Sequence, residues 1–137
     1  YCSSKFALEA MSDALRLELA PWGISVSLVE PGAIQSQIWQ RATVSATRTL
    51  GGVEPEALAL YAQPLSRMQE VMAAAAARAI PAEVVARVVA DALIAARPRA
   101  RYLVGKDARF RATLKWILPD RAQDRLLAWF LGLPHRG

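Results

Sequence analysis

The feature that most constrains the fold is a helical pattern at the start of the chain that leads directly into a short β-branched segment. Apolar residues recur at three- and four-residue spacing over residues 1–20, which predicts an amphipathic helix. Pro21 ends this helix and Gly23 completes the turn. Residues 24–29 are rich in β-branched side chains and lie between Gly23 and Pro31, which predicts a buried strand. A helix followed closely by a strand is half of a crossover unit, so we expect an α/β fold with a parallel sheet.

The predicted strand ends in a turn made by Glu30, Pro31 and Gly32. In an open α/β sheet, ligands bind beyond the carboxyl ends of the strands. Pro31 would make the exit from the strand rigid, and Gly32 would let the backbone approach a flat ring closely. The turn is therefore a candidate ligand-binding element.

Tyr1 and Lys5 are four residues apart, so they lie on the same face of the predicted helix. A free tyrosine has a pKa of about 10, which makes it a poor proton donor at neutral pH. A lysine cation nearby favours the phenolate and brings that pKa toward the working range. The pair can therefore act as a general acid/base unit, although the same spacing also occurs by chance on solvated helices.

The sequence that follows the pair is more specific. The run YCSSKFALEAMSDALRLELAPWGISVSLVEPGAI resembles the central segment of the short-chain dehydrogenase/reductase family, in which a Tyr-x-x-[Ser/Ala]-Lys helix leads into a parallel strand ending in Pro-Gly. The resemblance implies hydride transfer between NAD or NADP and an alcohol or carbonyl substrate. It implies that Tyr1 exchanges a proton with the substrate oxygen, while Lys5 supports Tyr1 electrostatically and binds the nicotinamide ribose.

The same resemblance gives cofactor-binding roles to the residues of the turn. Pro31 and Gly32 match the turn beside the nicotinamide, and Ile34 matches the position whose backbone pairs with the carboxamide. Ser36 stands where the family most often has threonine, so a hydroxyl is retained.

Other parts of the family pattern do not occur in residues 1–137. Gly51 and Gly52 follow no predicted strand and lack the third glycine of a dinucleotide-binding loop. The residues that choose between NAD and NADP, the serine that orients the carbonyl and the asparagine of the proton relay all precede the Tyr helix in the family. Two functions therefore stay open. The chain is part of a nicotinamide-dependent alcohol dehydrogenase or carbonyl reductase, or it is a truncated, non-catalytic chain that cannot bind the cofactor by itself.

The predicted fold is the C-terminal portion of a Rossmann-like, doubly wound parallel sheet that is incomplete in this chain. Residues 1–36 hold the catalytic helix, the strand and the Pro-Gly turn. Residues 37–80 form a substrate loop or lid, residues 81–105 a helix and the last strand, and residues 106–137 the C-terminal helices. In detail, residues 33–53 lack periodicity and predict a polar connection. Helices are expected over residues 54–80, with a possible break at Pro64, and over 81–96, 107–118 and 120–131, with a strand at 102–104.

Apolar residues of the lid favour a bulky apolar alcohol or ketone as the small-molecule substrate. The outer apolar residues of the first helix are interpreted as subunit packing, because the equivalent helix in the family helps to build a dimer, so the intact protein is expected to be a homo-oligomer. Aromatic residues near the end of the chain occur among arginines, and they could lie on an anionic membrane surface or pack in an ordinary core. These aromatic residues are Phe110, Trp116, Trp129 and Phe130.

Composition excludes several other classes. The chain has 17 Lys and Arg against 12 Asp and Glu, but the positive charge is spread along the second half without the pattern of an RNA-binding sheet, so no nucleic-acid partner is expected. A single cysteine, Cys2, excludes an internal disulfide, favours a reducing compartment such as the cytoplasm, and is interpreted as a helix-packing residue. No cluster has metal-ligand spacing, and His135 is interpreted as solvated.

The sequence also bears on membrane spans and on the extent of the polypeptide. Glu83, Arg87 and Asp91 interrupt the most apolar stretch, so no membrane span is expected. Residue 1 is Tyr rather than Met, from which we expect the chain to be a portion of a longer polypeptide.

Overall fold

The computed structural model describes residues 1–133, which form two compact units. The first unit combines Tyr1–Gly32 with Pro81–Arg109, and the second combines Ala33–Ile80 with residues from 110 onward. Two parallel strands with helices between and beside them confirm the α/β class, as an incomplete portion of a doubly wound sheet. His135 lies outside the described residues.

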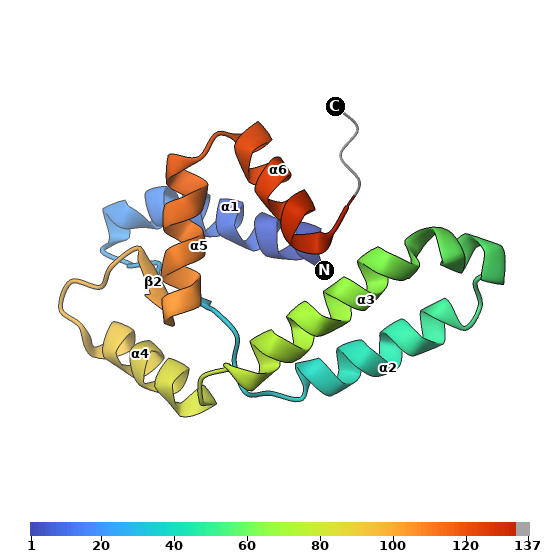
Figure 1. The fold of residues 1–137 in the computed structure, drawn as a ribbon. Helices are drawn as coiled ribbons and strands as arrows, with labels where there is room; N and C mark the ends of the chain where they lie inside the picture. Colours follow the sequence, from blue (N-terminus) through green and yellow to red (C-terminus); the bar gives the residue numbers. More distant parts are fainter. Residues whose placement is uncertain (134–137) are drawn as a thin grey trace. The chain divides into compact units, whose positions relative to one another are not determined.

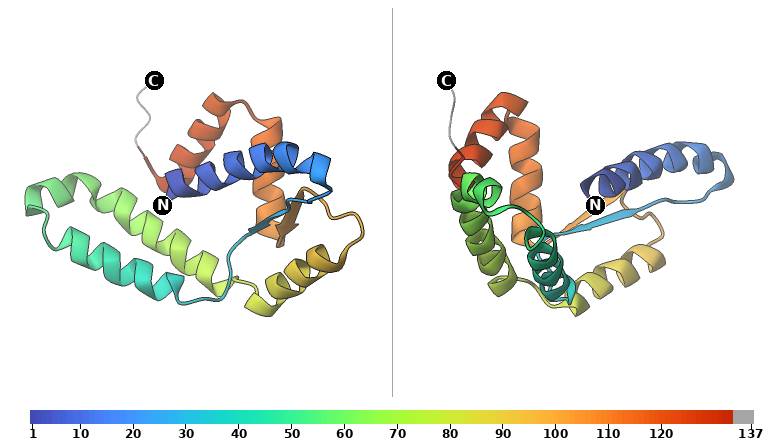
Figure 2. Two further views of the ribbon diagram at one scale, coloured as in Figure 1. Left: turned by 180° about the vertical axis from the view of Figure 1, so that it is seen from behind. Right: turned by 90° about the vertical axis from the view of Figure 1, so that its right-hand side faces the viewer.

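The first unit is built on the strand pair. Helix α1 (Cys2–Leu19) passes through the short 3-10 turn η1 (Ala20–Trp22) into strand β1 (Leu28–Pro31), and helix α4 (Ala82–Ile94) precedes strand β2 (Arg101–Val104). The strands are parallel, with Leu28 opposite Arg101 and Pro31 opposite Val104. Helix α4 packs on both strands, and α1 lies on the opposite side of the strand pair (Figure 2). The first helix and the strand at 102–104 were therefore predicted correctly.

The first strand lies later in the chain than predicted. The sequence predicted residues 24–29, whereas β1 runs from Leu28 to Pro31 and is only half-buried. The physical reason is the partner strand. Because β2 begins at Arg101, opposite Leu28, residues 24–27 precede the start of the ladder. The side chain of Ser27 instead donates a hydrogen bond to the carbonyl of Arg99, at 2.8 Å.

The second unit is helical. Helices α2 (Ile38–Leu50) and α3 (Pro55–Ala77) form an antiparallel hairpin (Figure 1), and α6 (Asp120–Leu131) packs on α3. The Arg67 guanidinium on α3 donates a hydrogen bond to the carbonyl of Phe130 on α6, at 3.3 Å. Helix α5 (Lys106–Ile117) begins in the first unit and ends in the second. Apart from shifts of a few residues at their ends, the helices predicted for 54–80, 81–96, 107–118 and 120–131 are confirmed, and α3 continues through Pro64.

The expectation of an irregular connection over residues 33–53 was wrong, because α2 occupies most of it. The polar side chains that hid its periodicity bond within the helix itself. The hydroxyl of Thr43 donates to the carbonyl of Trp39 and that of Thr47 to the carbonyl of Thr43, both at 3.0 Å. Such bonds to the carbonyl four residues earlier satisfy a threonine inside a helix.

Little apolar surface is buried within the described chain. Among residues 1–133, the buried apolar residues are Ala79 and Val104, and no large side chain is fully buried. Trp116 and Trp129 are 88% and 74% exposed, and Phe110 and Phe130 are exposed as well, so these aromatics do not form a core here. Their contact with a membrane surface stays a prediction, as does subunit packing by the outer face of α1. None of the helices in the described residues is both long enough and apolar enough to span a bilayer.

Candidate active site

The structure brings Tyr1 and Lys5 together at the start of α1. The backbone N–H of Lys5 donates to the carbonyl of Tyr1 at 3.1 Å, which is the first hydrogen bond of the helix. The Lys5 ammonium lies 5.2 Å from the centroid of the Tyr1 ring, a cation–π distance. Tyr1 is 81% exposed. The predicted pairing of a phenol with a cation is therefore present in the fold.

Pro31 and Gly32 lie at the carboxyl end of β1. The N–H of Gly32 donates to the carbonyl of Val104 at 2.9 Å, which extends the pairing of the two strands by one residue. A Cβ atom added at Gly32 would overlap the carboxylate of Asp107, in the first turn of α5. A side chain at position 32 would therefore displace the Asp107 carboxylate. The sequence analysis did not select Asp107, and nothing in its local pattern would have shown the contact.

Ile34 and Ser36 belong to the second unit and fall after β1 and before α2 in the sequence. Ile34 forms a parallel bridge with Ile80, since the N–H of Ile80 donates to Ala33 and the N–H of Gln35 donates to Ile80, both at 2.9 Å. The carbonyl of Ile34 accepts a hydrogen bond from the indole N–H of Trp39 at 2.7 Å. Any ligand amide that pairs with this carbonyl would therefore share it with Trp39. Ser36 is exposed.

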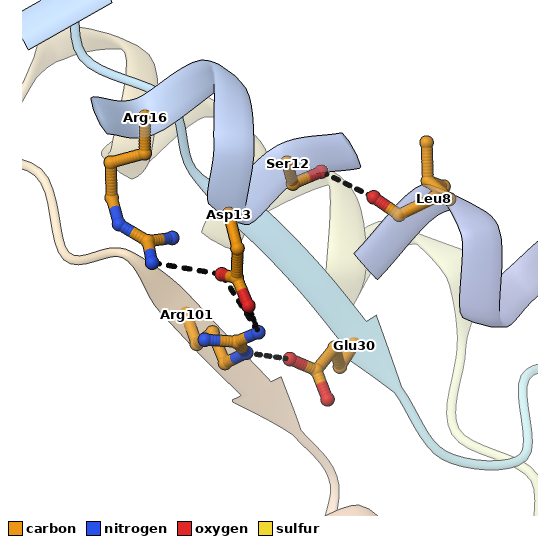
Figure 3. Close-up of polar contacts among 6 residues, drawn as sticks. All are labelled: Leu8, Ser12, Asp13, Arg16, Glu30 and Arg101. Atoms are coloured by element: carbon orange, nitrogen blue, oxygen red, sulfur yellow. Dashed lines mark hydrogen bonds and ion pairs between the residues drawn. The ribbon is translucent and has the colours of Figure 1, made fainter. Parts of the chain in front are cut away.

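A cluster of charged residues joins α1 to the two strands (Figure 3). Arg101 Nη2 lies 3.0 Å and 2.9 Å from the two carboxylate oxygens of Asp13, and Arg101 Nε lies 3.2 Å from Glu30 Oε1. Arg16 also contacts Asp13, at 2.8 Å. The Glu30 contact is an ion pair without hydrogen-bond geometry, and this buried oxygen accepts no hydrogen bond from residues 1–133. We refer to Asp13, Arg16, Glu30 and Arg101 as the charged cluster.

The charged cluster makes Asp13 a stronger acid than usual. Hydrogen bonds from Arg101, and then from Arg16, hold the pKa of Asp13 below its ordinary value of 3.8. Because the pKa is lowered in the folded state, the pairing stabilises the fold above that ordinary value and its contribution is lost as the pH falls through the lowered pKa. The pairing is therefore fully formed at neutral pH.

Metal-ligand groups and the free cysteine complete the description of the candidate residues. No three His, Cys, Asp or Glu side chains in residues 1–133 come together as metal ligands would. Cys2 is a free, exposed thiol rather than the packing residue that the sequence suggested.

Comparison with known proteins identifies the family of the chain. A family model described as short chain dehydrogenase matches residues 1–46. An NADPH-dependent 3-dehydrocapnine reductase of Ornithobacterium rhinotracheale is 35% identical over 92% of this chain, and retinol dehydrogenase 5 of Mus musculus is 34% identical over 98% of it. The chain belongs to the short-chain dehydrogenase/reductase family.

Sequence similarity to the short-chain dehydrogenase/reductase family covers more of the chain than the Tyr-x-x-x-Lys helix. The uncharacterized oxidoreductase YbbO of Escherichia coli (strain K12) is 35% identical over 93% of the chain. The chain spans 42%, 44% and 40% of the lengths of the reductase, the retinol dehydrogenase and YbbO, respectively. Similarity to the family therefore includes α2–α6 as well as the Tyr-x-x-x-Lys helix.

The contact between Gly32 and Asp107 gives a test of how the strand end of this family member is built. In the full-length protein, Gly32→Ala should lower the free energy of unfolding by about 1–3 kcal/mol, because the new methyl group overlaps the Asp107 carboxylate. In an Asp107→Ala background, which removes that carboxylate, the same change should have much less effect. Urea unfolding of the four proteins of this cycle measures both values.

Gly52→Ala is the matched control for that cycle, since a Cβ there meets its nearest atom, the Thr49 carbonyl oxygen, at 3.8 Å. An equal loss of stability from Gly32→Ala in both backgrounds would show that Asp107 is not the obstacle.

Proposed function

We propose that the protein containing this chain is an NAD(P)-dependent oxidoreductase that transfers a hydride between a nicotinamide cofactor and an alcohol or carbonyl substrate. The observation that carries the proposal is the Tyr1–Lys5 pair, with its ammonium 5.2 Å from the phenol ring, on a helix that leads into a parallel strand ending at Pro31 and Gly32. Because the chain spans less than half of its relatives, the activity is proposed for the whole protein.

In this proposal the residues of the chain handle the proton and hold the substrate. A bound nicotinamide supplies or accepts the hydride. The Tyr1 hydroxyl donates a proton to the carbonyl oxygen during reduction and takes it back from the alcohol during oxidation. The Lys5 ammonium stabilises negative charge on the Tyr1 oxygen and would donate hydrogen bonds to the ribose hydroxyls of a bound cofactor.

The proposal assigns the nicotinamide end of such a cofactor to Pro31, Gly32, Ile34 and Ser36, as the family resemblance implies. Ser36 offers an exposed hydroxyl, whereas the carbonyl of Ile34 already accepts the indole N–H of Trp39 and the space beside Gly32 holds the Asp107 carboxylate. The cofactor is NAD or NADP. One relative is named as NADPH-dependent, whereas the residues that make this choice in the family precede the Tyr helix. A reducing compartment, with the cytoplasm as the proposed location, suits the free thiol of Cys2.

Tyr1→Phe in the full-length protein should lower kcat by about 10²–10⁴-fold, because the general acid/base is lost while the ring that contacts Lys5 remains. Tyr102→Phe is the matched control. It removes a hydroxyl that accepts a hydrogen bond from the backbone of Arg99, on a strand and away from the proposed chemistry. Steady-state oxidation of an alcohol, followed by nicotinamide absorbance, measures both variants. Near-normal turnover by Tyr1→Phe would remove Tyr1 from the mechanism.

The proposed substrate is bulky and apolar. The α2–α3 hairpin contains a pocket of about 390 Å³ near its loop, and its lining is entirely apolar or aromatic. The lining residues are Leu50, Val53, Ala57, Leu58, Tyr61, Pro64, Leu65 and Met68. An apolar lining of this kind favours a long alkyl or polyene chain over a sugar, because a polar substrate would lose its hydration without gaining partners.

The pocket predicts a selective effect on substrate preference. Leu58→Gln should lower kcat/KM for a long-chain alcohol by about 10-fold while leaving that for a short alcohol nearly unchanged, since a polar group enters the apolar lining. Leu60→Gln is the matched control, because Leu60 is 80% exposed and does not line the pocket. Equal kcat/KM losses for both alcohols, or for both variants, would contradict a substrate role for the hairpin.

The alternative function, a non-catalytic chain, applies to residues 1–137 by themselves. The small buried core of residues 1–133 supports it, and so does the fact that no Gly-x-Gly-x-x-Gly turn, the element that holds the dinucleotide phosphates between a strand and a helix N-terminus in such folds, occurs in residues 1–137. Calorimetric titration of NADH and NADPH into the purified 137-residue chain should therefore detect no binding at micromolar concentrations. A micromolar dissociation constant for either cofactor would overturn this expectation.

A further inference from the structure

The face of α1 that is covered within the first unit is mainly polar. Glu9, Asp13 and Arg16 are half-buried there and Ser12 is buried, with its hydroxyl bonded to the carbonyl of Leu8 at 2.7 Å. The large apolar residues of the helix are exposed instead: Phe6, Leu8, Met11, Leu15 and Leu17. Within this unit, the position of α1 on the strand pair therefore depends on polar contacts more than on burial of apolar side chains.

Arg101 makes the contacts that link α1 to both strands (Figure 3). Arg101 is the first residue of β2. Its Nη2 atom donates to both carboxylate oxygens of Asp13 on α1, and its Nε atom lies near the Glu30 carboxylate on β1. The planar guanidinium can contact two carboxylates in different directions at once, whereas a lysine ammonium is a compact point charge.

The two carboxylates lie on the elements that carry the proposed active site. Glu30 directly precedes Pro31 and Gly32. Asp13 is on the same helix as Tyr1 and Lys5, eight residues beyond Lys5. Arg101 itself is remote from the start of that helix, since a helix rises about 1.5 Å per residue and twelve residues therefore cover about 18 Å.

We propose that Arg101 is a positioning residue, which fixes the tilt of α1 against the end of β1 and thereby places Tyr1 and Lys5 relative to the Pro31–Gly32 turn. The proposal rests on the function proposed above. Over a lever of about 18 Å, a tilt of about 4° moves Tyr1 by about 1 Å. A displacement of that size at a reacting group can lower the rate by about 100-fold.

The alternative is that Arg101 forms an ordinary surface ion pair without a functional role. Its side chain is 39% exposed and that of Asp13 is 44% exposed, and pairs of this kind contribute little to stability. The two readings predict different kinetics. A positioning residue affects kcat much more than the stability of the fold, whereas an ordinary surface pair affects neither appreciably.

The test compares Arg101→Met with Arg99→Met in the full-length protein. Arg99 is an exposed arginine two residues earlier whose side chain is not part of the charged cluster. Arg101→Met is expected to lower kcat by about 10–100-fold, with the urea midpoint of unfolding nearly unchanged. Arg99→Met should leave kcat within about twofold of the original protein.

Asp13→Asn supplies a second, independent arm. It should lower kcat in the same direction, and the double variant Asp13→Asn, Arg101→Met should be no slower than Arg101→Met alone, because both changes break the same link. Fully multiplicative losses would overturn the proposal. If Arg101→Met does not fold, Arg101→Lys decides, since it keeps the charge but cannot hold both carboxylates. A reduced kcat in that folded variant supports the proposal, and an unchanged kcat overturns it.

Failure of this inference is distinguishable from failure of the proposed function. Equal kcat values for Arg101→Met and Arg99→Met, in a protein whose Tyr1→Phe variant is inactive, would overturn the positioning role and leave the function intact. A full-length protein without nicotinamide-dependent activity, or one whose Tyr1→Phe variant is fully active, would overturn both.

Discussion

The guanidinium of Arg101 joins three elements of the first unit that are far apart in the sequence. Its contacts with Asp13 and Glu30 connect α1, β1 and β2. The guanidinium of Arg16 forms a second ion pair with the Asp13 carboxylate. Hydrogen bonds from both arginines lower the pKa of Asp13, so the link is fully ionised at neutral pH. The contact of α1 with the strand pair thus uses charged side chains where many folds would use apolar packing.

This dependence fits the distribution of apolar surface. The face of α1 that meets the strand pair carries Glu9, Ser12, Asp13 and Arg16, while Phe6, Met11 and Leu17 are exposed. The second unit differs, because its α2–α3 hairpin carries an open, apolar pocket of about 390 Å³.

Local features were predictable from the sequence, and long-range contacts were not. The Tyr1–Lys5 pair follows from helical spacing alone, and α4 and β2 follow from a valine-rich periodic run and a short strand closed by Gly105. The Arg101–Asp13 contact joins residues 88 positions apart, and the Gly32–Asp107 contact depends on how α5 meets the strand end, so neither leaves a local pattern. Helix α2 was missed because its threonines satisfy their hydroxyls within the helix and so weaken the apolar periodicity. The roles given to Ile34 and Ser36 stay predictions.

The proposed function gives this chain the proton-transfer half of a hydride-transfer site. It can be tested by reduction of a long-chain ketone by the full-length protein, with NADH and NADPH deuterated on either face of nicotinamide C4. Mass spectrometry of the alcohol should find one deuterium on the former carbonyl carbon, delivered from one face of one cofactor, with the hydroxyl proton drawn from solvent. An alcohol product without deuterium from any of these cofactors, or no reduction at all, would contradict the account.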